Sequence, residues 1–444
     1  MNDTELHALL VGALSPALQA PALHVAFSGG LDSTVLLHLL VEQRSRRSLP
    51  PLHAIHVHHG LQPVADAWPE HCRAFCAALG VPLHVEYVTV HPQASLEQAA
   101  RQARYAAFAR LMGEGDCLLS AQHRDDQAET LLFRLLRGAG VRGLSAMSAS
   151  RALGGGQLLR PLLGVARADL EGYAQRHGLN WVEDPSNQDL RHARNFLRGQ
   201  VMPVLRSRWP QASASLARSA AHLSEAQQLL DELASADLAA AARTDAFPWL
   251  SLPTLALAPL AALSPARQRN ALRHWLAAFS RLPDTDHWAG WEALRDAGPE
   301  AHPVWALADG QLHRAAGQLW WLSGDWLRPS AASVAGQSVV WPNLGQPLKL
   351  SGNGLLSFIG PAPVGAFEVR YRQGGECLEV PGRGRRDLKR LFNERGVPGF
   401  VRNRVPLLFQ GGQLLAVANI HGLDGLGVGG GRLRWQPPAG DQCL

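Results

Sequence analysis

The sequence predicts a mixed α/β fold, in which a parallel-sheet domain is followed by an α-helical domain and a small α+β domain. Three observations indicate this order. Over residues 1–204 short apolar runs alternate with longer helical patterns, as in domains built on a parallel sheet. Over 205–327 alanine- and leucine-rich segments repeat with a period of about 3.6 residues. Residues 366–444 combine β-like runs with an arginine-dense helix.

In the first segment each apolar run is read as a strand and the pattern after it as a helix. The expected strands are 23–27, 53–58, 83–90 and 117–121, and the expected helices are 34–40, 66–79, 95–112 (capped by Ser95) and 125–137. Residues 328–365 are rich in Gly, Pro and Ser, which predicts a linker with short strands. In the last segment, 405–409 and 414–418 are expected to be strands.

Composition excludes several classes of protein. A chain of 444 residues with 46% hydrophobic and 18% charged residues can bury a large core and is too long for one ordinary domain. Five cysteines without a Cys-x-x-Cys pair argue against a disulfide scaffold, a zinc site or an iron–sulfur site. No apolar segment reaches the roughly 20 residues of a spanning helix. We therefore expect a cytoplasmic protein that does not enter a membrane.

Positive charge is concentrated near the end of the chain. The formal net charge is +5, and residues 366–436 contain 12 Lys and Arg against 6 Asp and Glu. A solvated charged face is the usual reason for such a run, but its confinement to one module favours a polyanionic partner. The candidate nucleic-acid contacts are Arg383, Arg385, Arg386, Lys389, Arg390 and Arg395.

A glycine-containing loop lies between the first predicted strand and its helix. Two glycines let the backbone approach an anion, and the helix N-terminus offers unpaired N–H groups. The carboxylate of Asp32 could hold Mg²⁺ against phosphates. The alternative, an ordinary glycine turn, accounts poorly for the whole run. The candidate phosphate-binding residues are Ser28, Gly29, Gly30, Leu31, Asp32 and Ser33.

A second polar group surrounds the start of the fourth helix. Asp126 and Glu129 are three residues apart and share a helix face, so they could bind an ammonium group or take its proton. The same spacing also fits a capping box with Asp126 as the N-cap. Asp125 could be the cap or a second Mg²⁺ ligand. His123, just before them, is a candidate of undefined role.

Arg194 and Arg198 lie four residues apart and share a helix face. They could contact a phosphate, a bound nucleotide or a substrate carboxylate. Their alternative is a solvated face.

The run Ser28–Ser33 after a strand resembles the PP-loop of the N-type ATP pyrophosphatases, which have a Rossmann-like parallel-sheet domain. Further motifs narrow the resemblance to the long, three-domain bacterial members of the tRNA(Ile)-lysidine synthetase family. In chain order they are Ser120–Thr130, Arg134–Gly138, Arg160–Leu163, Trp181–Asn187 and Arg194–Arg198, with His58–Leu61 and Arg101-x-x-Arg104-Tyr105 in agreement. Gln122 departs from the pattern, because many members have histidine there.

The resemblance implies an ATP- and Mg²⁺-dependent ligase that joins free L-lysine to the wobble cytidine of tRNA(Ile) with a CAU anticodon. It makes Asp32, His123, Asp126, Glu129, Arg194 and Arg198 the catalytic candidates, with Asp126 and Glu129 next to lysine. Two alternatives are a tRNA thiolase of the same superfamily, against which the cysteine pattern argues, and a non-catalytic tRNA-binding protein. A homodimer is left open.

Overall fold

The computed structural model describes residues 1–90, 96–242, 247–283, 287–298, 301–328, 338–361, 365–426 and 430–438. The predicted helix cap Ser95 lies outside the described residues, as do parts of the predicted linker (329–337 and 362–364) and the end of the chain, 439–444. The chain divides into two compact units, Met1–Gln228 and Leu229–Leu444. None of the described helices is both long and apolar enough to span a bilayer.

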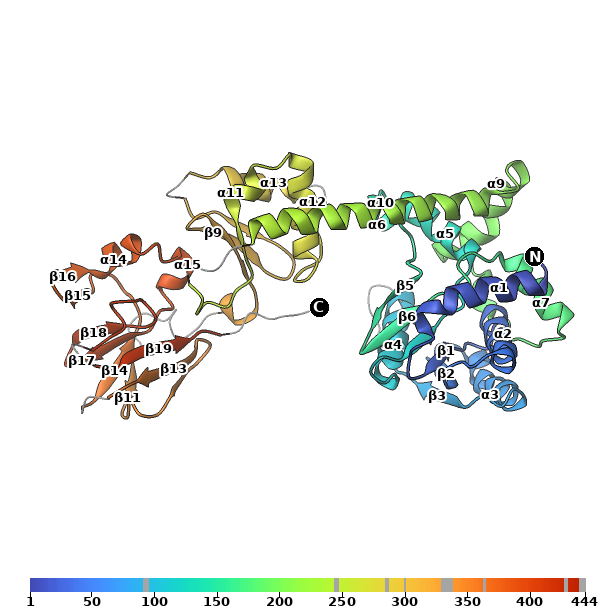
Figure 1. Cartoon of the computed structure of the whole chain (residues 1–444), viewed down its shortest axis with the longest axis horizontal. Coiled ribbons are helices and arrows are strands. Elements are labelled where there is room, and N and C mark those ends of the chain that lie inside the picture. Colours follow the sequence, from blue (N-terminus) through green and yellow to red (C-terminus); the bar gives the residue numbers. More distant parts are fainter. Residues whose placement is uncertain are drawn as a thin grey trace. The chain divides into compact units, whose positions relative to one another are not determined.

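A six-stranded sheet forms the centre of the first unit (Figure 1). Its order is β3-β2-β1-β4-β6-β5, and neighbouring strands are parallel except β5 and β6. The strands are β1 Leu23–Ala26, β2 Leu52–His58, β3 Leu83–Tyr87, β4 Cys117–Leu119, β5 Ser150–Leu153 and β6 Gly156–Leu159. The mostly parallel sheet confirms the predicted fold class, and β1 to β4 are the four predicted strands.

Helices cover both faces of this sheet. They are α1 Asp3–Leu14, η1 Ser15–Ala17, α2 Leu31–Arg46, η2 Pro63–Ala67, α3 Trp68–Ala78, α4 Leu96–Leu111 and α7 Arg167–Arg176. Successive strand residues point to opposite faces. Ala54 and Leu119 therefore pack with α1, α2, α3 and α7, whereas their neighbours Ile55 and Leu118 pack with Phe108 of α4.

The strand order decides where a ligand can bind. β1 lies between β2 and β4, so the loops that leave the carboxyl ends of β1 and β4 are neighbours at one edge. From β1 the sheet extends through β2 and β3 on one side and through β4 and β6 on the other. Open α/β sheets bind ligands at such a reversal of strand order.

Short helices follow the sheet and complete this edge. They are α5 Arg124–Leu135, α6 Val141–Leu144, η3 Pro185–Gln188, α8 Ala193–Phe196, the π-helical turn η4 Leu197–Val201 and α9 Met202–Arg208. The long helix α10, Ala212–Ala241, runs from the first unit into the second.

The middle of the chain contains a sheet that the helical prediction missed. Its strands, in the order β7-β10-β9-β8, are β7 Thr254–Ala256, β8 Val304–Ala306, β9 Gln311–Ala315 and β10 Gln318–Leu322. The helices are α11 Leu257–Ala261, α12 Pro265–Leu276, α13 Trp288–Asp296 and η5 Gly324–Trp326. Every residue of β10 is buried, so this strand shows no alternation of polar and apolar residues.

The remaining strands build two larger sheets and a hairpin, ordered β11-β14-β17-β18, β12-β13-β19 and β15-β16. The elements are β11 Val339–Trp341, β12 Leu348–Leu350, β13 Gly354–Ile359, β14 Phe367–Arg370, β15 Cys377–Val380, β16 Gly384–Asp387, α14 Leu388–Glu394, α15 Gly399–Arg402, β17 Leu407–Gln410, β18 Gln413–Val417 and β19 Arg432–Gln436. The predicted linker does contain short strands, but β11 pairs with β14 and β13 with β19. Its described part therefore shares one core with the residues that follow.

Candidate functional site

The loop after β1 is held in shape by its own hydrogen bonds. The backbone N–H of Ser28 donates to Ser33 Oγ at 3.2 Å, and the Ser33 hydroxyl donates to the Gly30 carbonyl at 3.0 Å. Gly29 has a φ of 82°, a left-handed conformation that glycine adopts without strain. Helix α2 begins directly after Gly30, so its first N–H groups have no partner within the helix. The loop thus offers the donors and the positive helix end that a phosphate needs.

Asp32 lies in the first turn of α2 and lines a pocket above this loop. Its Oδ1 is buried and has no hydrogen-bond partner, while Oδ2 is 3.6 Å from His123 Nε2. A buried carboxylate oxygen without a partner is costly unless a cation or donor reaches it. The residues present here therefore fit a Mg²⁺ ion held between Asp32 and a phosphate chain.

The capping box at α5 differs from the predicted alternative. His123 is the N-cap: its Nδ1 accepts from the backbone N–H of Asp126 at 3.4 Å, and its own backbone N–H donates to Asp126 Oδ2 at 3.1 Å. The interpretation with Asp126 as cap and Glu129 reaching back is wrong, because the helix begins earlier, at Arg124. Glu129 is consequently free to make other contacts.

His123 connects the two predicted groups of site residues. It is 1% exposed, and its Nε2 faces Asp32 at 3.6 Å and Asp126 at 3.4 Å. Burial lowers the pKa of His123, but the hydrogen bond with Asp32 and the nearby charges of Asp126 and Asp125 outweigh it and raise that pKa above the usual value. His123 therefore links the phosphate loop to α5.

Asp126 and Glu129 form an ion-pair cluster with the two predicted arginines. Arg194 Nη2 is 2.9 Å and Arg198 Nη2 is 3.0 Å from Asp126 Oδ1. Arg198 Nε donates to Glu129 Oε1 at 2.8 Å, and Arg194 Nε donates to Glu129 Oε2 at 3.3 Å. Arg198 sits in the π-helical turn η4, a local widening often found at functional sites. Glu129 is 2% exposed, so these arginines neutralise a buried carboxylate.

The structure therefore brings six predicted residues together but gives them different surroundings. Asp32, Asp126, Arg194 and Arg198 line the pocket, whereas Glu129 and His123 lie behind it. The predicted carboxylate pair faces guanidinium groups rather than open space. Sequence spacing could not show this, because the arginines come from a segment about 70 residues later.

Asp125 does not reach the pocket. Its Oδ2 accepts from the backbone N–H of Arg167 at 2.9 Å, and its Oδ1 accepts from Arg206 at 2.6 Å. Burial raises the pKa of Asp125, but these donors and Ser213 have the larger, opposite effect, so the pKa lies below its usual range. With both oxygens engaged, Asp125 anchors the start of α7 and is no longer a Mg²⁺ candidate.

The pocket has a volume of about 1230 Å³ and is lined by residues from the ends of β1, β2 and β4, from α4 and from 181–198. The segment after Trp181 is tied to the phosphate loop, because the Val182 N–H donates to the Gly29 carbonyl at 2.9 Å. Gln122, the departure from the motif, accepts from buried Arg160 at 3.1 Å. Arg104 and Tyr105 also line the pocket, although their motif suggested no role for them.

The buried cysteines of the first unit do not favour sulfur transfer. His56 binds the Phe27 carbonyl at 2.9 Å and, with His58 and His59, lines the pocket. Burial raises the pKa of Cys72 and Cys76 to about 12 and that of Cys117 to about 11. Such thiols remain protonated at neutral pH, whereas sulfur chemistry needs a thiolate.

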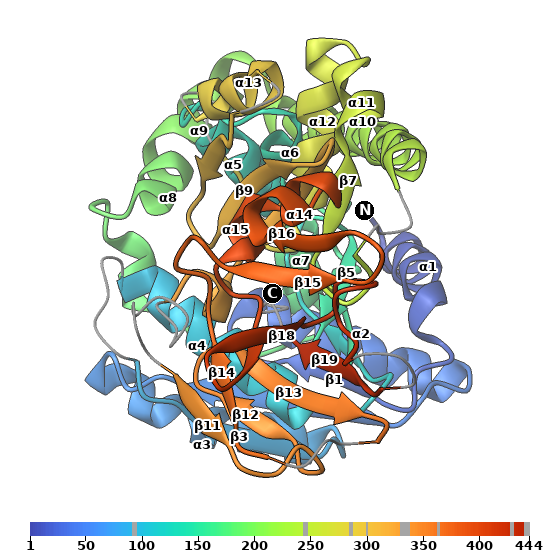
Figure 2. The ribbon, with the colours of Figure 1, turned by 90° about the vertical axis from the view of Figure 1, so that its left-hand side faces the viewer.

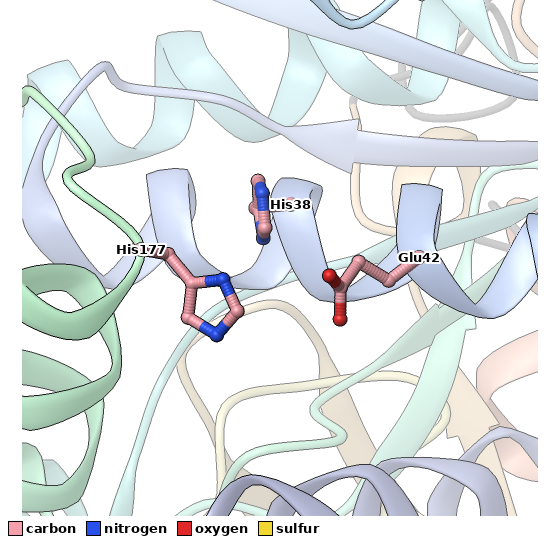
Figure 3. Close-up of side chains that lie close together, drawn as sticks. All are labelled: His38, Glu42 and His177. Atoms are coloured by element: carbon pink, nitrogen blue, oxygen red, sulfur yellow. The ribbon is translucent and has the colours of Figure 1, made fainter.

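A different group of possible metal ligands lies away from the pocket. Among the described residues, His38, Glu42 and His177 each place one ligand atom within 4.8 Å of the others (Figure 3). Each of them already has a protein partner. His38 pairs with the Tyr173 hydroxyl at 2.8 Å, His177 with Asp3 at 2.9 Å, and Glu42 with His7 at 2.8 Å. This network ties α1, α2 and α7 together, and we assign it no metal.

The predicted nucleic-acid contacts gather on the β15–β16 hairpin and α14, which lie side by side in the second unit (Figure 2). Arg383 is paired with Glu394 at 3.0 Å, and Arg395 donates to the His421 carbonyl at 3.3 Å. The other four predicted residues are exposed, except for Arg386, which is partly exposed. These four residues, Arg385, Arg386, Lys389 and Arg390, are together called the basic patch.

Family models match three parts of the chain. One described as a PP-loop domain matches residues 4–205, and two described as the TilS substrate binding domain and the TilS substrate C-terminal domain match 255–320 and 367–436. A protein of Pseudomonas syringae pv. tomato named tRNA(Ile)-lysidine synthase is 62% identical over 443 residues, covering 100% of this chain and 98% of its own. The chain belongs to the tRNA(Ile)-lysidine synthase family.

Other members of the tRNA(Ile)-lysidine synthase family extend this relationship. The Pseudomonas aeruginosa protein is 60% identical over the whole of both chains, and the Shigella flexneri protein is 43% identical over 89% of this chain and 91% of its own. As a family member, the chain is an ATP-dependent ligase of the PP-loop type. The family and the enzyme class that the motifs predicted are both confirmed.

Replacing Gly29 tests the geometry of the phosphate loop. An added Cβ at Gly29 would lie 3.0 Å from Cys72 Sγ and 3.2 Å from Val182 Cγ2, on a backbone with positive φ. Gly29→Ala should lower the free energy of unfolding by about 1 to 2 kcal/mol and weaken ATP binding. Gly12→Ala is the control, because a Cβ there meets nothing within 4 Å in helix α1, and it should stabilise by about 0.5 to 1 kcal/mol. Urea unfolding measures the stability of each variant, and ATP titration measures its affinity for ATP. Equal effects of the two changes would contradict the assigned loop geometry.

Cysteine reactivity tests the exclusion of sulfur chemistry. Native protein treated with iodoacetamide at pH 8 should leave Cys72, Cys76 and Cys117 unmodified, because burial raises their pKa values to about 11 or 12. Partly exposed Cys377 should be alkylated, and urea should release the other three. Peptide mass spectrometry identifies the modified residues. Rapid alkylation of Cys72 or Cys76 in the native protein would reopen the thiolase alternative.

Proposed function

We propose that this protein ligates free L-lysine to C2 of the wobble cytidine of tRNA(Ile) with a CAU anticodon. The observation that carries the proposal is relationship at about 60% identity over the whole chain to proteins named tRNA(Ile)-lysidine synthase. The pocket supports it, because it combines a phosphate loop with a dense group of charged side chains.

The reaction proceeds in two steps. The O2 of cytosine attacks the α-phosphate of ATP, and pyrophosphate leaves. The ε-amine of lysine then attacks C2, the C2–O2 bond breaks and AMP leaves, while the amine loses its proton. Free lysine has a pKa of about 10.4, so a nearby group or water has to take up that proton. Lysidine then pairs with A, which changes both the codon and the amino-acid identity of the tRNA from methionine to isoleucine.

The first step uses the donors of the loop. The N–H groups at the start of α2 and the hydroxyls of Ser28 and Ser33 would hold the departing pyrophosphate. Asp32 would hold Mg²⁺, which supplies charge neutralisation at the phosphates. Arg194 and Arg198 line the same pocket and would reach the nucleotide.

The second step uses the ion-pair cluster. Asp126 has both oxygens engaged, Oδ1 by the two arginines and Oδ2 by the His123 N–H. Phosphates that attract Arg194 and Arg198 would weaken their hold on Asp126, and its carboxylate could then accept the lysine ammonium. Glu129 is buried behind the arginines and acts as a positioning residue for them.

The second unit would hold the tRNA. The basic patch suits contacts with tRNA phosphates. The proposal also includes the division predicted from the sequence, with a catalytic domain (1–204), a recognition domain (205–327) and a basic tRNA-binding end. The free thiols of the described cysteines and a tRNA substrate fit a cytoplasmic location.

A labelled-lysine assay tests the proposed function. The protein is incubated with ATP, Mg²⁺, radiolabelled lysine and unmodified transcripts of tRNA(Ile) with CAU anticodon and of elongator tRNA(Met). Label is expected in the isoleucine species only, and Asp32→Asn should abolish both label and pyrophosphate release while preserving tRNA binding. Label in neither tRNA would reject the proposed function, and full turnover of the variant would reject the role assigned to Asp32.

The basic patch is tested by point substitution, because a deletion from residue 366 would separate paired strands. Changing Arg385, Arg386, Lys389 and Arg390 to Gln should weaken tRNA binding and reduce the slope of log Kd against log salt by about 0.7 to 0.9 for each phosphate that is no longer neutralised. Arg281→Gln, an exposed change elsewhere in the same unit, is the control. Filter binding at several salt concentrations gives the slopes; an unchanged slope in the patch variant would remove its role.

A further inference from the structure

The second unit contains a pocket of about 370 Å³ that the proposed reaction does not use. Its walls come from β8 and β9 and from the region of α15, and its polar and aromatic lining includes His302, His313, Arg372, Phe400, Arg402 and Asn403. The walls belong to the two parts of the chain that match the second and third family models. A volume of this size admits a group of about the size of one nucleotide.

Positive charge in this pocket has no counter-charge. Arg372 Nε is buried without a hydrogen-bond partner, and none of the described residues that line the pocket is Asp or Glu. Arg402 is held in place by donating to the Val397 carbonyl at 2.8 Å and to Asn393 Oδ1 at 2.6 Å. Burial and the nearby charge of Arg372 lower the pKa of Arg402. Two neighbouring guanidinium groups without a carboxylate favour an anion between them.

An aromatic ring lies in the same pocket. Phe400 is partly exposed and packs edge-on against His313, with ring centroids 5.4 Å apart. Behind it lie Trp320 and Trp326, with ring centroids 5.9 Å and 6.0 Å away, which hold the ring in position. Burial lowers the pKa of His313 to about 4, so its imidazole is neutral at pH 7, and its Nε2 pairs with Gln311 Oε1 at 3.0 Å. A fixed aromatic ring can stack with a nucleotide base, and the two nearby guanidinium groups can bind the phosphate of the same nucleotide.

We propose that this pocket binds one unpaired nucleotide of the tRNA, with its phosphate on Arg372 and Arg402 and its base against Phe400. The inference rests on the proposed function in taking tRNA as the ligand. Unpaired nucleotides are favoured over a helical stem, because only an unstacked base can enter a pocket and lie on an aromatic ring. The pocket is separate from the basic patch in its residues and would add selectivity for an unpaired position to a general attraction for phosphates.

Binding of full-length tRNA(Ile) by the full-length protein tests this assignment. Arg372→Gln and Phe400→Leu should each raise the Kd by about fivefold or more, in line with the loss of one stacked nucleotide. Arg434→Gln is the matched control, since it removes one exposed charge from β19, and it should change the Kd less than about twofold. Thermal melting shows whether each variant is folded. Because Arg372 Nε has no hydrogen-bond partner within the protein, Arg372→Gln breaks no hydrogen bond at that atom.

The outcomes separate this inference from the proposed function. Equal Kd values for Arg372→Gln, Phe400→Leu and the control would overturn the pocket assignment even if the wild-type protein forms lysidine. If wild-type protein transfers no lysine but the two pocket variants still lose tRNA affinity, the proposed function fails and the pocket stands. A further arm measures thermal melting with inorganic phosphate or AMP. If either raises the melting temperature of the wild-type protein more than that of Arg372→Gln, and the two proteins bind tRNA equally well, the pocket takes a small anion. The inference would then be wrong.

Discussion

The ion-pair cluster of Asp126 and Glu129 with Arg194 and Arg198 is the interaction on which the rest of the site depends. Glu129 is almost fully buried, and a buried carboxylate is tolerated only with partners of opposite charge. Its pairing fixes the turn of α8 and η4 against α5. Because Asp126 also closes the capping box with His123, the same cluster sets the position of His123 beside Asp32.

This arrangement explains how two distant segments form one pocket. The sheet places the loops after β1 and β4 side by side, and the cluster then closes the third wall with residues 181–198. Within the cluster the carboxylates belong to α5, and the guanidinium groups belong to α8 and η4. Under the proposed function the arginines would meet phosphates and Asp126 would meet an ammonium group, while within the cluster the two carboxylates already balance the two guanidinium groups.

Much of this could be predicted from the sequence. Asp32 and His123 were both identified as candidates that follow predicted strands, but their meeting at 3.6 Å depends on the strand order β2-β1-β4, which the sequence did not predict. The spacing of Arg194 and Arg198 correctly predicted one shared face. The partner of Asp125 could not be predicted, because Arg206 is 81 residues away. The sheet of β7 to β10 was missed because its strands are short and do not alternate polar with apolar residues. In β10 every residue is buried, so no such alternation is expected.

The most direct test of the central claim is a double-mutant cycle on Glu129→Gln and Arg198→Gln, with kcat/KM for lysine transfer to tRNA(Ile) as the readout. Each single change unbalances the charge of the cluster by one, although Arg194 and Asp126 still contact the remaining partner, and the double change removes one charge of each sign. If the cluster acts as one unit, the double variant should be no less active than the worse single variant, with a coupling of about 1 to 3 kcal/mol. Losses that add within about 0.5 kcal/mol would show that the two residues act independently, and would contradict this account.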